Sequence, residues 1–216
     1  MIILGGNDGY MQFPENGLNE AAAYDPSTDV WRLLELPIDL LVTDAVWTGT
    51  EVVMYGIRHY LGPLFGVSYE PATDTWRSLP NAPVGRPVPD IDRVGDEILA
   101  WSYDPEEDGV AALDTVTLEW RELPPLPGQP TEGIPHAAAL GPYGVLMQSE
   151  TVMAIYSAES REWRPIDPPA VNMEPYTRQP VWTGTEVLFF QAGLPSGNPN
   201  FPYGIAAQFW AYNPQH

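Results

Sequence analysis

A tandem repeat of about 45 residues constrains the fold of this chain more than any other feature. Tryptophans at positions 31, 76, 120 and 163 are spaced by 45, 44 and 43 residues, and each is followed by an arginine. Seven positions before these tryptophans stand Tyr24, Tyr69, Leu113 and Tyr156. A period of this length indicates a series of similar supersecondary units, each packing on its neighbours.

Each repeat contains two predicted β-hairpins. The one that ends at the tryptophan has acidic, proline-containing turns at 25–29 and 70–74. Proline presets φ in such a turn, and the carboxylate and hydroxyl groups can bind backbone N–H groups. The other hairpin has glycine at its tip, as in the similar segments 45–55 and 181–190. Two hairpins per period predict a four-stranded antiparallel sheet, whose strands we name a, b, c and d in chain order.

Composition excludes several classes of partner and site. The chain has 29 acidic residues against 9 arginines and no lysine, a formal net charge of −20. A surface this acidic repels the phosphate backbones of nucleic acids and anionic lipid. We therefore expect no nucleic-acid partner. The absence of cysteine removes disulfides and thiolate metal sites. The apolar runs are too short for a membrane-spanning helix, and the start of the chain is not typical of a signal peptide.

The repeat resembles kelch-repeat β-propellers, in particular bacterial kelch-like and galactose-oxidase-central-domain-like proteins. Those repeats have a glycine after strand b, a Tyr-Asp-Pro-type turn, and a tryptophan that opens strand d. The matching residues here are Gly5-Gly6, Tyr24-Asp25-Pro26 and Trp31, and then Gly56, Tyr69-Glu70-Pro71 and Trp76. The double glycine occurs only in the first copy, and the third and fourth copies lack the Asp-Pro turn.

The resemblance implies an all-β, kelch-type β-propeller of four-stranded antiparallel blades, forming one domain over 1–216. We expect about five blades, with strand a missing from the first and strand d from the last, because the next tryptophan would fall three residues after His216. We therefore interpret the chain as a fragment of a six- or seven-bladed ring. The expected boundaries are a partial blade at 1–36, blades at 43–80, 89–124 and 135–168, and a partial blade at 178–216.

The b–c and d–a loops share one face of such a blade, and we expect ligands to bind there. Aromatic rings offer flat apolar surfaces, while amide and guanidinium groups give directed hydrogen bonds, which suits a glycan or a peptide. The alternative is that these side chains cap the blade cores or lie in solvated loops. The candidate ligand-binding residues are Tyr10, Phe13, Arg58, His59, Tyr60, Arg178, Phe201 and Tyr203.

A second group of polar residues is expected at the mouth of the central channel, five positions before each tip glycine. These residues are Asp44, Asp90, His136 and Gln179. Carboxylates and an imidazole around one axis could hold a polar substrate, whereas a solvated channel mouth is the simpler interpretation. The acidic run 104–108 lacks the alternating ligand spacing of a calcium loop, so no metal site is predicted. The arginine after each tryptophan recurs in every repeat, which indicates a structural role, either stacking on a neighbouring ring or pairing with an acidic turn.

Two functions are compatible with these features. The first is a monomeric, non-catalytic recognition module without a cofactor, which binds a protein or a glycan through the b–c/d–a face. The second is a sugar-modifying enzyme of mutarotase or epimerase type that uses Asp44, Asp90, His136 and Arg178 at the channel. A third interpretation is purely structural, a β array within a larger surface protein. Copper-radical relatives need a cysteine-linked tyrosine and paired histidines, which this chain lacks. The resemblance alone suggests an extracytoplasmic location.

Overall fold

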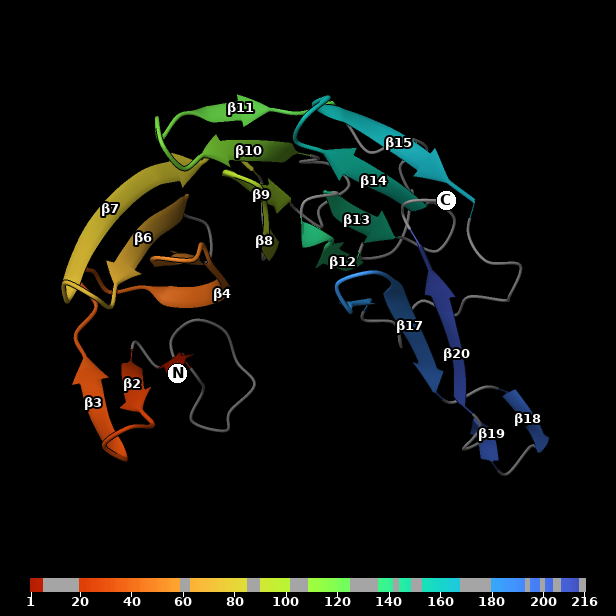
Figure 1. The fold of residues 1–216 in the computed structure, drawn as a ribbon, viewed down its shortest axis with the longest axis horizontal. Coiled ribbons are helices and arrows are strands. Elements are labelled where there is room, and N and C mark those ends of the chain that lie inside the picture. Colours follow the sequence, from red (N-terminus) through yellow and green to blue (C-terminus); the bar gives the residue numbers. More distant parts are fainter. Residues whose placement is uncertain are drawn as a thin grey trace. The chain divides into compact units, whose positions relative to one another are not determined.

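The computed structural model describes residues 1–5, 20–58, 63–84, 90–101, 109–124, 136–141, 144–148, 153–167, 180–192, 195–198, 201–203 and 207–213. Antiparallel β-strands make up its regular structure, which confirms the predicted all-β class and the four-stranded antiparallel sheets (Figure 1). The chain divides into two compact units, 1–91 with 99–122 and 92–98 with 123–216. None of the described helical turns is long and apolar enough to cross a membrane.

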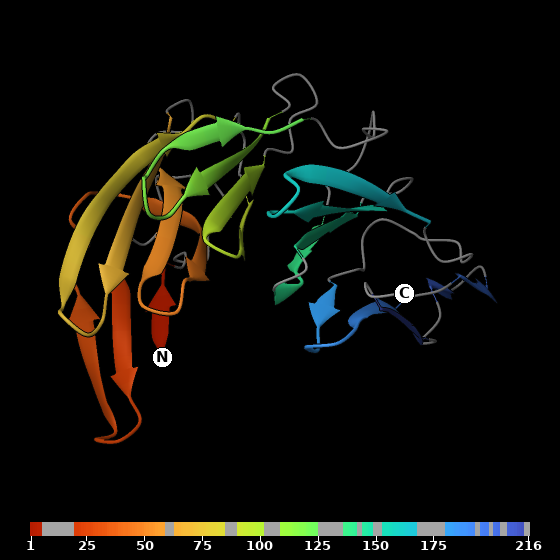
Figure 2. The same ribbon diagram turned by 45° about the horizontal axis from the view of Figure 1, so that its top comes forward.

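The first unit contains one complete sheet, which we call sheet 2. Its strands pair in the order a-b-c-d, and they run side by side in orange to yellow in Figure 2. Strand b carries the run Val53, Met54 and Tyr55, at most 1% exposed, because both faces of this strand are covered. The strands of sheet 2 are β4 (Leu41–Trp47), β5 (Val52–Ile57), β6 (Leu64–Glu70) and β7 (Thr75–Ala82).

Among the described residues, sheet 1 contains the b, c and d strands, in agreement with the phase of the repeat. It consists of β1 (Ile2–Leu4), β2 (Ala21–Asp25) and β3 (Val30–Leu34), in that order. The row Leu4–Ala21–Leu34 crosses the sheet and lies on the face that packs against Met54 and Val67 of sheet 2. Side chains alternate across strands, so the opposite face carries Ile3 and Leu33, which are 50% and 79% exposed.

Sheet 3 also has four strands, and the boundary between the two units passes through it. Its strand order is β11-β10-β9-β8. Strand β9 is buried along its whole length. Sheet 3 comprises β8 (Asp90–Val94), β9 (Glu97–Trp101), β10 (Val110–Asp114) and β11 (Trp120–Glu122).

The second unit contains sheets 4 and 5. Sheet 4 has the order a-b-c-d, whereas sheet 5 has the strands a, b and c and ends at β20. Leu140, Leu146 and Ile155 of sheet 4 form a core with Val187 and Phe189 of sheet 5. The strands are β12 (His136–Ala139), β13 (Val145–Gln148), β14 (Met153–Ser157) and β15 (Glu162–Ile166), then β16 (Val181–Trp182), β17 (Val187–Ala192) and β20 (Ala207–Tyr212).

The region between β17 and β20 differs from the sequence-based prediction. Phe201 and Tyr203 were expected on a b–c loop, but the structure contains a separate two-stranded sheet there. This hairpin consists of β18 (Pro195–Asn198) and β19 (Phe201–Tyr203). The glycines and prolines that favoured a loop instead lie in and around an irregular hairpin, whose register shifts between Pro195 and Asn198.

The c–d hairpins share one backbone geometry in four copies, although their turn sequences differ. The residue two positions before each repeat tryptophan has φ between 56° and 60°. Aspartate tolerates this left-handed conformation better than leucine or arginine does. The third and fourth copies therefore keep the turn without its favoured residue. The four positions are Asp29, Asp74, Leu118 and Arg161.

The tyrosine of each repeat packs on the tryptophan of the same hairpin. Ring centroids are 5.0 Å apart for Tyr24–Trp31, 4.8 Å for Tyr69–Trp76 and 5.4 Å for Tyr156–Trp163. Leucine replaces this tyrosine in the third copy. There Trp120 contacts Tyr55 of the preceding sheet edge-on, at 5.6 Å. The conserved spacing of the sequence is thus a cross-strand aromatic pair, which stabilises a hairpin.

Candidate functional site

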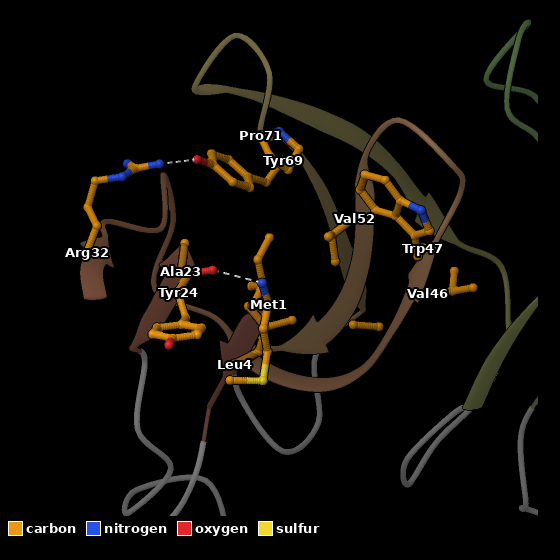
Figure 3. A pocket seen from close by; sticks show the side chains of 12 residues that line it. Met1, Leu4, Ala23, Tyr24, Arg32, Val46, Trp47, Val52, Tyr69 and Pro71 are labelled. Atoms are coloured by element: carbon orange, nitrogen blue, oxygen red, sulfur yellow. Dashed lines mark hydrogen bonds between the residues drawn. The ribbon is translucent and has the colours of Figure 1, made fainter. Parts of the chain in front are cut away.

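A pocket of about 500 Å³ lies between sheet 1 and sheet 2, within the first unit (Figure 3). Its walls are mostly apolar and include Leu4 of β1, Val52 of β5 and Trp47 at the end of β4. Trp47 remains 52% exposed. The pocket lies at the end of the sheets where the a–b and c–d turns are found, which is opposite to the predicted b–c/d–a face.

The polar edge of the pocket is a closed set of three side chains. Arg32 reaches across from β3 and donates from Nη2 to the Tyr69 hydroxyl at 2.7 Å (Figure 3). Its Nη1 donates to Asp74 Oδ1 at 2.8 Å. The Tyr69 hydroxyl in turn donates to Asp74 Oδ1 at 2.8 Å. For Arg32, this geometry confirms the predicted structural role, because the guanidinium pairs with the acidic turn of the next repeat.

The pKa values of these groups follow from the same contacts. The hydrogen bonds from Tyr69 and Arg32 lower the pKa of Asp74. Burial and the neighbouring carboxylate raise the pKa of Tyr69, while Arg32 opposes that shift. The carboxylate and the guanidinium are therefore held charged and the phenol protonated around neutral pH, so this edge positions charges and does not exchange protons.

Related contacts recur at other repeats, with partial replacement of the residues. Tyr24 donates to Asp29 Oδ1 at 2.8 Å within its own hairpin. In the second unit, Arg164 Nη2 lies 3.5 Å from the hydroxyl of Tyr212, which has the place of Tyr69 in sheet 5. Tyr156 instead donates to Glu97 Oε2 at 3.1 Å. A tyrosine hydroxyl with a charged partner is thus a feature of the repeat, whereas the pocket beside Arg32 belongs to sheets 1 and 2.

The predicted channel-mouth residues are brought together only in part by the described structure. Asp44 accepts the N–H of Ala45 on Oδ1 at 2.7 Å and that of Ile91 on Oδ2 at 2.8 Å. Burial raises the pKa of Asp44, and the charge of nearby Asp90 raises it further. Asp44 therefore links the a strands of sheets 2 and 3. His136 lies in β12, where only its backbone is described, and Gln179 lies outside the described residues.

The predicted loop residues lie mostly outside the described parts of the chain. Arg58 is described, and its Cζ stands 5.6 Å from the centroid of the Phe65 ring, an arrangement that favours cation–π attraction. Phe201 and Tyr203 belong to β19. The candidates that fall outside the described residues are Tyr10, Phe13, His59, Tyr60 and Arg178.

Sequence reasoning did not predict the pocket, which lies between sheets 1 and 2. Among the described residues, no group of three or more histidines and carboxylates could hold a metal ion. Comparison of the sequence with models of known protein families and with curated proteins finds no match.

Proposed function

We propose that this chain is a kelch-type β-propeller recognition module, which binds a protein or a glycan and does not transform it. The observation that carries the proposal is the pocket between sheets 1 and 2, of about 500 Å³, with aromatic and aliphatic walls and a polar edge whose groups bind one another. Binding sites typically combine an apolar concavity with a few fixed polar groups. The net charge of −20 favours a partner that carries positive charge.

Repeated contacts between sheets support the propeller arrangement in this proposal. Trp120 donates from Nε1 to the carbonyl of Pro80 at 3.2 Å, and Trp163 does so to the carbonyl of Pro124 at 2.9 Å. Each tryptophan begins a d strand, and each proline stands four residues after the preceding repeat tryptophan. A link that recurs from sheet to sheet at the same position is what radially repeated blades require.

The b–c/d–a face is a second part of the proposal. The hairpin β18–β19 extends beyond the ends of β17 and β20 in Figure 1, and it carries Phe201 and Tyr203. A hairpin holds aromatic residues at a lower conformational cost than a flexible loop does. This placement favours contact with a flat ligand at this end of the sheet.

Binding to glycan and peptide arrays tests the proposal. We expect specific ligands that are lost in either the Trp47→Ala variant or the Phe201→Ala/Tyr203→Ala double variant, with thermal unfolding by circular dichroism as the control for folding. A ligand set that is unchanged in both variants would remove both surfaces from the proposal.

The alternative, a sugar-modifying enzyme, gains no support from Asp44. Both of its carboxylate oxygens accept backbone N–H groups, which is the environment of a structural carboxylate. We expect the protein to leave the anomer exchange of free sugars unchanged in NMR exchange spectra. An acceleration that is lost in Asp44→Asn would replace the recognition proposal with the enzymatic one.

A further inference from the structure

The pocket between sheets 1 and 2 presents an aromatic side chain to solvent. Trp47 is 52% exposed, whereas Trp182, which has the same place in sheet 5, is partly buried against the core of that sheet. Both tryptophans precede the sequence Thr-Gly-Thr-Glu, so the two positions differ in their packing and not in their residue type. Leu4 and Val52 add aliphatic walls beside Trp47 (Figure 3). The volume of about 500 Å³ is sufficient for a bulky side chain of a ligand.

The phenol groups that line this pocket are already hydrogen-bonded to other side chains. The Tyr69 hydroxyl donates to Asp74 and accepts from Arg32, and the Tyr24 hydroxyl donates to Asp29. Each phenol has therefore used its only proton. A glycan carries many hydroxyl groups, and its affinity falls when those groups lose water without gaining new partners. The pocket therefore favours an apolar side chain over a sugar.

The turns beside the pocket carry more acid than base. Their two arginines, Arg32 and Arg77, are each held in an ion pair. Among the described residues, the side chains of Asp25, Asp29 and Glu70 have hydrogen bonds only with neutral groups. Two of these acids follow directly after a tyrosine that lines the pocket. Their uncompensated charge favours a ligand that carries positive groups next to its apolar side chain.

We propose that this pocket binds a basic segment of a partner protein, with one aromatic side chain in the pocket and lysine or arginine against the acidic turns. The aromatic ring packs on Trp47 and Val52, and such anchors supply most of the affinity of an interface. The charges supply specificity and a faster association. This inference rests on the proposed recognition function, and for this surface it selects a protein ligand over a glycan.

A peptide probe tests the proposal on the whole chain. The probe is a fluorescein-labelled peptide with phenylalanine between two pairs of lysines. We expect saturable binding by fluorescence anisotropy, which weakens as salt is raised. We also expect the indole N–H signal of Trp47 to shift in NMR spectra while that of Trp182 stays in place. A peptide with serine for phenylalanine should bind about tenfold more weakly or less, and one with glutamate for lysine should not bind.

A pair of tryptophan variants separates the pocket from general attraction by the acidic surface. Trp47→Ala should weaken the probe about tenfold or more, as loss of an aromatic anchor does. Trp182→Ala is the control, because it removes the same residue type from the same place in another repeat. Circular dichroism of both variants checks that they are folded.

A second pair of variants tests the charges without removing apolar packing. Asp25→Asn/Glu70→Gln should weaken the probe severalfold and reduce its salt dependence. Glu159→Gln/Glu186→Gln makes the same change in charge on turns of the second unit, and it should leave the affinity nearly unchanged.

Three outcomes would overturn the proposal. These are a wild-type chain that does not bind the probe, equal binding of the serine peptide, or equal loss of affinity in both members of either variant pair. An array glycan whose binding is lost in Trp47→Ala would keep the recognition function but overturn the basic protein segment. Array ligands that depend only on Phe201 and Tyr203 would also keep the recognition function and overturn the role of the pocket.

Discussion

The interface of sheets 1 and 2 and that of sheets 4 and 5 are built from the same repeat but differ in one strand. Both bury apolar rows from two sheets, and in both a tyrosine hydroxyl of the later sheet meets an arginine of the earlier one. Sheet 4 contributes a complete a–b hairpin, and Trp182 lies against its tip. Among the described residues, sheet 1 pairs β1, β2 and β3, and a pocket lies between it and sheet 2.

This difference shows how a repeat scaffold can create a site. Every sheet needs its neighbours to cover its apolar faces, so residue types that form the core at one interface can line a pocket at another. Trp47 and Val52 need no special sequence to become accessible, because the same residue types at positions 182 and 187 are packed in sheet 5. Position in the array therefore decides whether this part of the repeat is core or surface.

The largest expected effect comes from disrupting the a–b hairpin of sheet 4. Gly144 has φ of 127°, and a Cβ there would stand 1.7 Å from the carbonyl oxygen of Tyr156. Gly144→Ala must therefore move β13 away from β14, and we expect a loss of more than about 3 kcal/mol in the free energy of unfolding of the second unit. Urea denaturation followed by circular dichroism measures this loss.

Gly95→Ala is the control for this change. Gly95 has φ of 59°, but an added Cβ would meet nothing within 4 Å, so the cost should be about 1 kcal/mol. Equal losses in the two variants would contradict the close approach of β13 and β14.

The next effect compares the two equivalent tryptophans directly. Trp182 packs in the core of sheets 4 and 5, so Trp182→Ala should cost about 2–3 kcal/mol, near the lower end for a buried tryptophan. Trp47 is 52% exposed, so Trp47→Ala should cost less than about 1 kcal/mol. Thermal and urea unfolding of both variants measure the difference. A larger loss for Trp47→Ala would mean that its pocket is filled in solution.

The sequence predicted the repeat well and the pocket poorly, for physical reasons. Alternation and turn residues act locally, so the hairpins and the missing strand of sheet 1 could be predicted from positions such as Trp31 and Gly49. The role of Asp44 could not, because its partner Ile91 is 47 residues away and donates from its backbone. Because the donor is a backbone N–H group, the residue type at that position does not identify it as a partner. The β18–β19 hairpin was missed because its glycines and prolines equally suit a loop.

The two aspartates of the first unit should respond to pH in opposite directions. The pKa of Asp44 is raised above 3.8 by burial, so its ionisation destabilises the fold, and its contribution to the free energy of unfolding falls as pH rises from 3.8 through the raised value. The pKa of Asp74 is lowered by Tyr69 and Arg32, so its contribution is present above 3.8 and is lost as pH falls through the lowered value.

Carboxyl NMR titration and urea unfolding at several pH values check this pair. Asp44→Asn should remove the component of the free energy of unfolding that falls with rising pH. Asp74→Asn should remove the component of opposite sign. Titration of Asp44 below Asp74 would contradict the burial that raises the pKa of Asp44 and the hydrogen bonds that lower the pKa of Asp74.

The smallest expected effect concerns the arginine that both interfaces share. Arg32 makes contacts of 2.7 and 2.8 Å with Tyr69 and Asp74, whereas the contact of Arg164 with Tyr212 is 3.5 Å long. The side chains of Arg32 and Asp74 are 50% and 62% exposed, so water and salt screen their attraction. We expect Arg32→Gln to lower the free energy of unfolding only slightly, and Arg164→Gln by less still. Urea unfolding at low and high salt separates the charge contribution, because only the Arg32 loss should shrink as salt is raised. A salt-independent loss would mean that Arg32 acts through packing of its aliphatic stem. Arg32 would then contribute to the apolar wall of the pocket and not to its charged edge.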